Sequence, residues 1–139
     1  MKHYGDICKL SGHDLPIVDI VCGGSPCQDL SVAGKRAGLD GARSGLFMEQ
    51  IRLIKEMRDE CKKRMGTTDA DGCIRPRYMV WENVPGAFSS NGGKDFWAVL
   101  QETAKVADKD AVIPGLEGGQ VDSFRMYHGR WVVHCLEST

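Results

Sequence analysis

One junction constrains the fold of this chain more than any other feature: a cysteine that closely follows a predicted buried strand. Residues 17–22 read Ile-Val-Asp-Ile-Val-Cys, and residues 23–28 read Gly-Gly-Ser-Pro-Cys-Gln. The apolar run predicts a strand over Ile17–Cys22, and the two glycines permit a tight turn after it. Pro26 fixes one dihedral angle there, so Cys27 is held stiffly. Because reactive groups gather at the carboxyl ends of strands in open α/β sheets, the junction predicts an α/β protein with Cys27 in its site.

A second predicted strand, Arg77–Glu82, ends in a carboxylate. Between the two strands, residues Leu46–Arg64 carry apolar side chains at helical spacing, which predicts a crossover helix and therefore parallel strands. A single glutamate at a strand end is usually a solvated surface residue. Its pairing with the Pro-Cys turn favours a functional role, and we expect Cys27 and Glu82 to project into one cleft.

The rest of the chain predicts fewer elements. Residues 1–15 form an opening segment with one short edge strand at most, and residues 95–106 have the spacing of a helix. Residues 111–139 are expected to form an irregular tail with a hairpin over 121–136. We expect a single domain over residues 1–139, since this length is near the usual domain size.

Composition excludes several classes of protein. Hydrophobic residues make up 42% and charged residues 27%, as in ordinary globular proteins rather than disordered ones. The sequence has neither an apolar run of membrane-spanning length nor a signal peptide, so we expect a cytoplasmic protein without a membrane partner. A net charge of −1 argues against tight DNA binding by this stretch alone.

The six cysteines show no CxxC pair and no Cys/His cluster, which argues against a metal site. A free cysteine usually behaves as a small buried apolar residue. We expect that structural role for the five cysteines other than Cys27. They are Cys8, Cys22, Cys61, Cys73 and Cys135.

Four short motifs occur in an order that resembles the catalytic half of the DNA cytosine-5 methyltransferases. They are Gly5-Asp6-Ile7, the stretch from Gly24 to Ser31, Arg43-Ser44-Gly45-Leu46-Phe47 and Glu82-Asn83-Val84. The resemblance covers residues 4–110. It implies a partial Rossmann-like parallel sheet with flanking helices, as in S-adenosylmethionine-dependent methyltransferases, to which the predicted hairpin is added. It also implies methylation of cytosine C5 in DNA, as in restriction–modification systems.

The resemblance implies covalent catalysis on a cytosine flipped out of the duplex. Cys27 would attack ring position C6 as a thiolate, which makes C5 nucleophilic toward the methyl group of S-adenosylmethionine. Glu82 would donate a proton toward ring N3, and that role needs a pKa raised by burial. Loss of the C5 proton would then release the thiol.

Further contacts are implied by the same resemblance. On the cofactor side, Asp6 would accept a hydrogen bond from the adenine amino group, and Pro26 and Leu46 would line an apolar wall. On the substrate side, four residues would hold the nucleotide or brace the pocket: Gln28, Ser31, Asn83 and Val84. Residues 31–44, rich in glycine and arginine, resemble a closing loop whose charges seek phosphate.

Some parts of the family pattern are not visible in the sequence. The family has an opening strand with a Gly-rich loop, a downstream Gln-x-Arg-x-Arg segment and a target-recognition domain. We therefore expect a central fragment of the catalytic domain that is inactive alone and meets DNA through the missing domain. Because such a fragment leaves a sheet edge open, we also expect copies of the chain to associate.

Three other functions stay open at this point. In the first, the chain is a non-catalytic remnant or the subunit of a split methyltransferase. In another it methylates cytosine in tRNA. In the third, Cys27 serves a hydrolase, but that chemistry needs a histidine near the thiol, and the sequence places none there.

Overall fold

The computed structural model describes residues 2–24, 45–66, 74–83 and 90–113. In chain order its elements are the short 3-10 helices η1 (Ile7–Lys9) and η2 (Gly12–Asp14), strand β1 (Ile20–Gly23), helix α1 (Gly45–Met65), strand β2 (Tyr78–Trp81), the 3-10 helix η5 (Ser90–Gly93) and helix α3 (Lys94–Ala107). The predicted hairpin over 121–136 lies outside the described residues.

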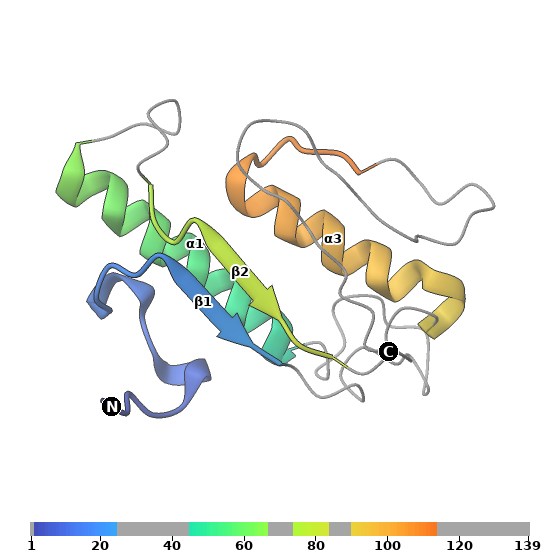
Figure 1. The fold of residues 1–139 in the computed structure, drawn as a ribbon, viewed down its shortest axis with the longest axis horizontal. Coiled ribbons are helices and arrows are strands. Elements are labelled where there is room, and N and C mark those ends of the chain that lie inside the picture. Colours follow the sequence, from blue (N-terminus) through green and yellow to red (C-terminus); the bar gives the residue numbers. More distant parts are fainter. Residues whose placement is uncertain (1, 25–44, 67–73, 84–89, 114–139) are drawn as a thin grey trace.

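The two strands are parallel neighbours joined through α1 (Figure 1). Ile20 faces Tyr78 across the pair, and Gly23 faces Trp81. Both strands therefore end at the same edge of the sheet. This arrangement confirms the prediction of an α/β fold with parallel strands and flanking helices, as in part of a methyltransferase sheet.

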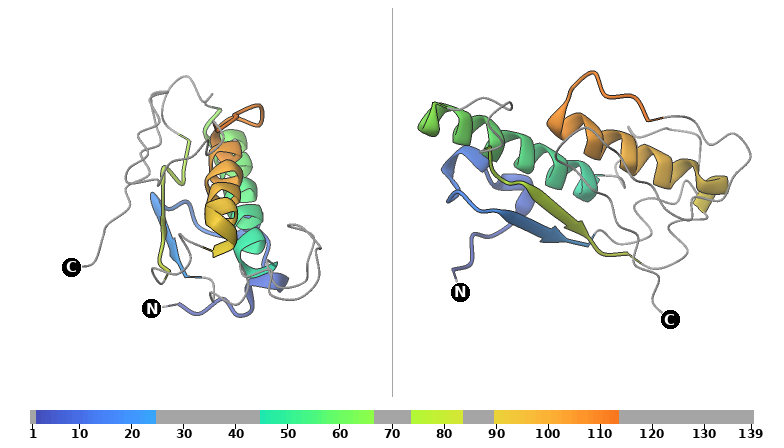
Figure 2. Two further views of the ribbon diagram at one scale, coloured as in Figure 1. Left: turned by 90° about the vertical axis from the view of Figure 1, so that its right-hand side faces the viewer. Right: turned by 45° about the horizontal axis from the view of Figure 1, so that its top comes forward.

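Helices α1 and α3 lie on the same side of the strand pair, so the described residues form two layers (Figure 2). Apolar side chains at helical spacing fill the space between the helices and the sheet. The buried members of this core are Phe47, Ile51, Phe96, Val99, Leu100, Ala104 and Ile113. The ring of Trp81 lies 6.0 Å from Phe47 and 6.3 Å from Phe96, between centroids. The end of β2 is thus held between α1 and α3.

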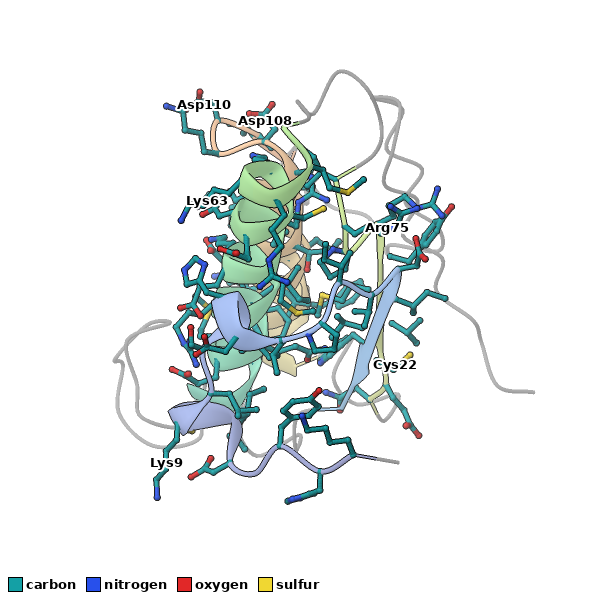
Figure 3. All side chains as sticks on the ribbon, turned by 90° about the vertical axis from the view of Figure 1, so that its left-hand side faces the viewer. Lys9, Cys22, Lys63, Arg75, Asp108 and Asp110 are labelled. Atoms are coloured by element: carbon teal, nitrogen blue, oxygen red, sulfur yellow. The ribbon has the colours of Figure 1, made fainter. Side chains whose placement is uncertain are left out.

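The other face of the sheet is exposed. Ile20 and Tyr78, which face each other in the register, are each 53% exposed, and Val80 is 51% exposed. Figure 3 shows Cys22 on the side of β1 that faces away from α1. Parallel sheets are usually covered on both faces. In the described residues this face is open.

One sequence prediction, the burial of the cysteines, is wrong in part. Cys8 and Cys22 are exposed rather than buried, because the first lies on a surface turn and the second on the open sheet face; only Cys61 is buried among the described cysteines. The sequence predicts at most one short edge strand in the opening segment, and the structure has none over residues 2–15. The side chains of Asp6 and Ser11 instead accept backbone N–H groups two residues ahead, which favours tight helical turns.

The other predicted elements form with small shifts of their bounds. The first strand begins at Ile20 rather than Ile17, because pairing starts where the Asp19 carbonyl accepts the N–H groups of Arg77 and Tyr78 at 2.9 and 3.0 Å. Helix α1 extends one residue beyond its predicted range at each end, as does α3.

Candidate active site at the carboxyl end of the sheet

The carboxyl ends of β1 and β2 bring Gly23, Gly24 and Glu82 together. The N–H of Glu82 donates to the carbonyl of Gly23 at 3.0 Å. A Cβ atom added at Gly24 would lie only 3.0 Å from the Glu82 carbonyl oxygen, so a glycine suits this close approach of the two chains. The backbone that leads into the Pro-Cys turn therefore touches the backbone at the predicted acid.

Several predicted site residues lie outside the described part of the chain, where their predicted contacts stay predictions. They are Pro26, Cys27, Gln28, Ser31 and Val84. Glu82 is exposed and Asn83 is half-buried. The burial expected for the Glu82 carboxyl is therefore not supplied by the described residues, because β2 ends at Trp81 and the next side chain leaves the core.

The predicted cofactor contacts occupy two places. Asp6 caps η1, and its carboxylate accepts the N–H of Cys8 at 3.0 Å. Leu46 lies in the first turn of α1 and is 41% exposed, an apolar side chain open to a ligand. Partial desolvation and then the negative charge of Asp6 raise the pKa of the Cys8 thiol above its usual range. The Asp6 carboxylate itself is exposed.

The sequence prediction missed Gln50, a buried amide beneath this edge of the sheet. Gln50 is 6% exposed, and its amide fills the space where a side chain at position 23 would go. Its Nε2 has no acceptor among the described residues. A polar residue that interrupts the apolar stripe between Phe47 and Ile51 is the signal that identifies such a position.

The described residues hold no group of three or more His, Cys, Asp or Glu side chains suited to a metal ion. None of the helices in this part of the chain combines the length and apolar character needed to span a bilayer.

Comparison with known proteins identifies the family. The family model for C-5 cytosine-specific DNA methylases matches residues 1–107. This chain belongs to that family. The matched range contains both strands and α1 and α3, as the resemblance over residues 4–110 predicted.

Three relatives illustrate the similarity. The orphan methyltransferase M.Rho11sI of Bacillus phage rho11s is 36% identical over 104 residues, which cover 75% of this chain and 17% of that protein. The type II methyltransferase M.NlaIV of Neisseria lactamica is 46% identical over 83 residues, or 60% of this chain and 16% of that protein. A protein of Escherichia phage P1 named DNA N-6-adenine-methyltransferase is 33% identical over an alignment of 142 positions, which covers 97% of this chain and 17% of that protein. The chain thus spans less than a fifth of the length of each of these three relatives.

Proposed function

We propose that this chain supplies the nucleophile and the acid of a methyltransferase that transfers a methyl group to C5 of cytosine in DNA. One observation carries the proposal. The chain belongs to the cytosine methylase family, and its strand ends place the segment before the Pro-Cys motif beside the Glu-Asn-Val motif. The contact between the two segments is a hydrogen bond that the Glu82 N–H donates to the Gly23 carbonyl at 3.0 Å. Cys27 follows Gly24 by three residues, so its Cα lies within about 11 Å of the Gly24 Cα.

Cys27 acts as the nucleophile. Its thiolate forms a bond to C6 of the cytosine, the electron pair of the C5–C6 double bond forms a C4–C5 double bond, and the electron pair of the C4–N3 double bond moves onto N3. The enamine that results is nucleophilic at C5. After methylation, a base removes the proton from C5, the double bond forms again, and the Cys27 sulfur leaves as thiolate.

Glu82 acts as the acid. Its carboxyl group donates a proton to ring N3 as the thiolate adds, which neutralises the charge that builds there, and the carboxylate takes this proton back when the thiolate leaves. Glu82 is exposed in the described part of the chain, so a bound base can reach its carboxyl group. Asn83 braces the Pro-Cys turn in this arrangement, and Val84 lines the base pocket.

S-adenosylmethionine, when bound, supplies the methyl group. The described residues fit such a ligand in two respects. Asp6 offers an exposed carboxylate that can accept the adenine amino group, and Leu46 offers an exposed apolar side chain. Pro26 completes the apolar wall, and Gln28 and Ser31 hold the flipped nucleotide.

In this proposal the chain forms part of the catalytic region, with DNA as its substrate and the cytoplasm as its place of action. Copies of the chain associate through an open sheet edge in this proposal, and the face around Ile20, Tyr78 and Val80, which is open in the described residues, offers apolar surface for the same contact. Sedimentation at increasing concentration tests this association. A chain that stays monomeric at millimolar concentration refutes it.

This proposal has alternatives that differ in the substrate or in having no activity. Methylation of tRNA uses the same chemistry on another polymer. The relative from phage P1 is named for adenine, but the matched family model is that of the cytosine enzymes. The inactive alternative is a non-catalytic remnant or the subunit of a split methyltransferase.

A chimaera tests the proposal. In M.NlaIV, the segment that matches this chain is replaced by the corresponding residues of this chain. Unmethylated genomic DNA is then treated with the purified chimaera. We expect 5-methylcytosine in nucleoside digests and in bisulfite sequencing. The Cys27→Ala variant loses the signal, whereas Cys22→Ala, which removes an exposed cysteine on the far face, keeps it. A folded chimaera that leaves every cytosine unmodified refutes the proposal.

Two more reactions identify the substrate. The same chimaera is incubated with bulk tRNA, and N6-methyladenine is measured in the DNA digests. We expect neither product. The unmodified chain, assayed alone, is expected to be inactive.

A further inference from the structure

Arg52 occupies a central position between α1 and the opening segment of the chain. Its guanidinium donates to Glu49 from Nε and to Glu56 from Nη1, both at 2.8 Å. These two carboxylates lie three residues before and four residues after Arg52 on the same helix, so they hold the side chain along the helix surface. Arg52 is therefore oriented before it makes any contact outside α1.

The same guanidinium reaches the turn that follows Asp6. Its Nη2 donates to the carbonyl of Ile7 at 3.0 Å and to the carbonyl of Leu10 at 3.1 Å. Pairs of exposed charges on one helix usually contribute little to stability. Contacts to two backbone carbonyls more than 40 residues away in sequence go beyond such a pair, because they fix the position of a separate segment.

The turn held by Arg52 determines where the Asp6 carboxylate lies. The Asp6 carbonyl accepts the N–H of Lys9 at 3.0 Å, and the Asp6 side chain accepts the N–H of Cys8 at 3.0 Å. The turn thus forms hydrogen bonds with both the backbone carbonyl and the side chain of Asp6. The carboxylate remains exposed, so an incoming donor can reach it.

A second attachment supports the first. Glu56, held by Arg52, accepts the N–H of Gly12 at 2.7 Å. Gly12 packs so closely on α1 that an added Cβ would lie 2.5 Å from the Leu53 carbonyl oxygen. The opening segment is therefore attached to α1 both at the Ile7–Leu10 turn and at Gly12, and Arg52 contributes directly to the first attachment and through Glu56 to the second.

We propose that Arg52 is a positioning residue for cofactor binding, which holds the Ile7–Leu10 turn so that the Asp6 carboxylate meets the amino group of an adenosine ligand. This inference rests on the proposed function of Asp6. A carboxylate already fixed in direction binds an amino group with less loss of conformational entropy than a mobile one. Lysine does not replace Arg52 here, because its single ammonium lacks the fork that reaches two carboxylates and two carbonyls together.

Calorimetric titration of the chain with S-adenosylmethionine tests the inference. We expect Arg52→Met to weaken binding about tenfold, and Asp6→Ala to weaken it at least as much. The double variant should bind within twofold of Asp6→Ala alone, since Arg52 acts through Asp6. Arg52→Lys should remain at least fivefold weaker than the parent chain.

Arg64→Met is the matched control. Arg64 lies on the same helix and makes the same kinds of contact, to the Glu60 carboxylate at 2.8 Å and the His13 carbonyl at 3.1 Å, but it does not hold the turn at Asp6. We expect its affinity to stay within twofold of the parent. Additive effects of the two site substitutions, full affinity in Arg52→Lys, or equal loss in Arg64→Met would each overturn the inference.

Hydrogen exchange separates this inference from the proposed function. In Arg52→Met, the amides of Lys9 and Leu10 should exchange at least tenfold faster than in the parent chain. Unchanged exchange there overturns the role of Arg52 alone. Faster exchange together with no binding by the parent chain overturns the cofactor site at Asp6, and the positioning role with it.

Discussion

The amide of Gln50 occupies the volume that a side chain at Gly23 would need. An added Cβ at position 23 would lie 2.7 Å from Nε2 and 2.9 Å from both Cδ and Oε1. Gly23 pairs with Trp81 at the last position of the strand register. The helix side chain and the strand end are therefore fitted to each other just before the Pro-Cys turn.

The first prediction concerns Gly23→Ala. The new methyl group displaces the Gln50 amide, and because this amide is the end of a flexible side chain we expect a loss of about 1 kcal/mol in the free energy of unfolding, the low end for overpacked sites. Urea unfolding followed by tryptophan fluorescence measures it. Gly45→Ala is the control, because nothing lies within 4 Å of a Cβ at that position. Equal stability of Gly23→Ala and the parent chain would contradict the close fit.

The second prediction compares two buried glutamines. Gln50 Nε2 has no acceptor in the described residues, whereas Gln101 donates to the Ala111 carbonyl at 2.6 Å and accepts the Ile113 N–H at 2.9 Å. A buried donor without an acceptor lowers stability by about 1–3 kcal/mol. We therefore expect Gln50→Met to raise the unfolding free energy and Gln101→Met to lower it by about 2 kcal/mol.

Differential scanning calorimetry of the two glutamine variants measures this contrast. Both substitutions keep the length of the side chain and remove its amide, so the difference reports the hydrogen bonds. A Gln50→Met chain that unfolds below the parent temperature would show that the Gln50 amide is bonded in solution.

The sequence predicts the strand–helix–strand unit well, because its signals are local. Apolar periodicity identifies α1, and short apolar runs closed by turn residues identify β1 and β2. The open sheet face was not predicted in detail, since alternation along four-residue strands does not tell which face a helix will cover. The exposure of Cys22 follows from that choice of face.

The sequence motifs predict the candidate site residues, and their roles stay predictions. Asp6, Leu46 and Glu82 follow from local motifs, and the meeting of Gly23 with Glu82 follows from the parallel register. Arg52 and Gln50 were not predicted, because their partners are distant in sequence. The partners of Arg52 include carbonyls of the opening segment, and Gln50 packs against a glycine of β1.

The third prediction concerns acid. Burial acts to raise the pKa of Glu56, but the Gly12 N–H and Arg52 outweigh it, so the pKa lies below its usual range. Arg75 and then Arg77 lower the pKa of Asp19. A carboxylate with a lowered pKa in the folded chain stabilises the fold above its unfolded pKa of about 4, and this stabilisation is lost as pH falls through the folded value.

We therefore expect the urea midpoint to be constant between about pH 5 and 7 and to fall below about pH 4. Glu56→Gln should have a lower urea midpoint at neutral pH, and its midpoint should fall less on acidification. The reason is that the variant lacks one of the carboxyl groups whose protonation is linked to unfolding. Asp59→Asn, at an exposed position of α1, is the control. The same acid dependence in Glu56→Gln as in the parent would show that Glu56 is not linked to folding.

The fourth prediction uses Cys8 as a reporter of Asp6. Partial desolvation and the Asp6 charge raise the pKa of the Cys8 thiol, and Asp6→Asn removes the charge while keeping an oxygen that can accept the Cys8 N–H. We expect the pKa of Cys8 to fall in this variant, so that alkylation by iodoacetamide at pH 8 becomes faster. Peptide mapping by mass spectrometry gives the rate at each cysteine over a range of pH.

Cys22, which is exposed on the sheet face that points away from α1, is the control and should react at the same rate in both chains. An unchanged rate profile at Cys8 would mean that the Asp6 carboxylate does not lie beside the thiol, and the turn that Arg52 holds would then have a different shape in solution.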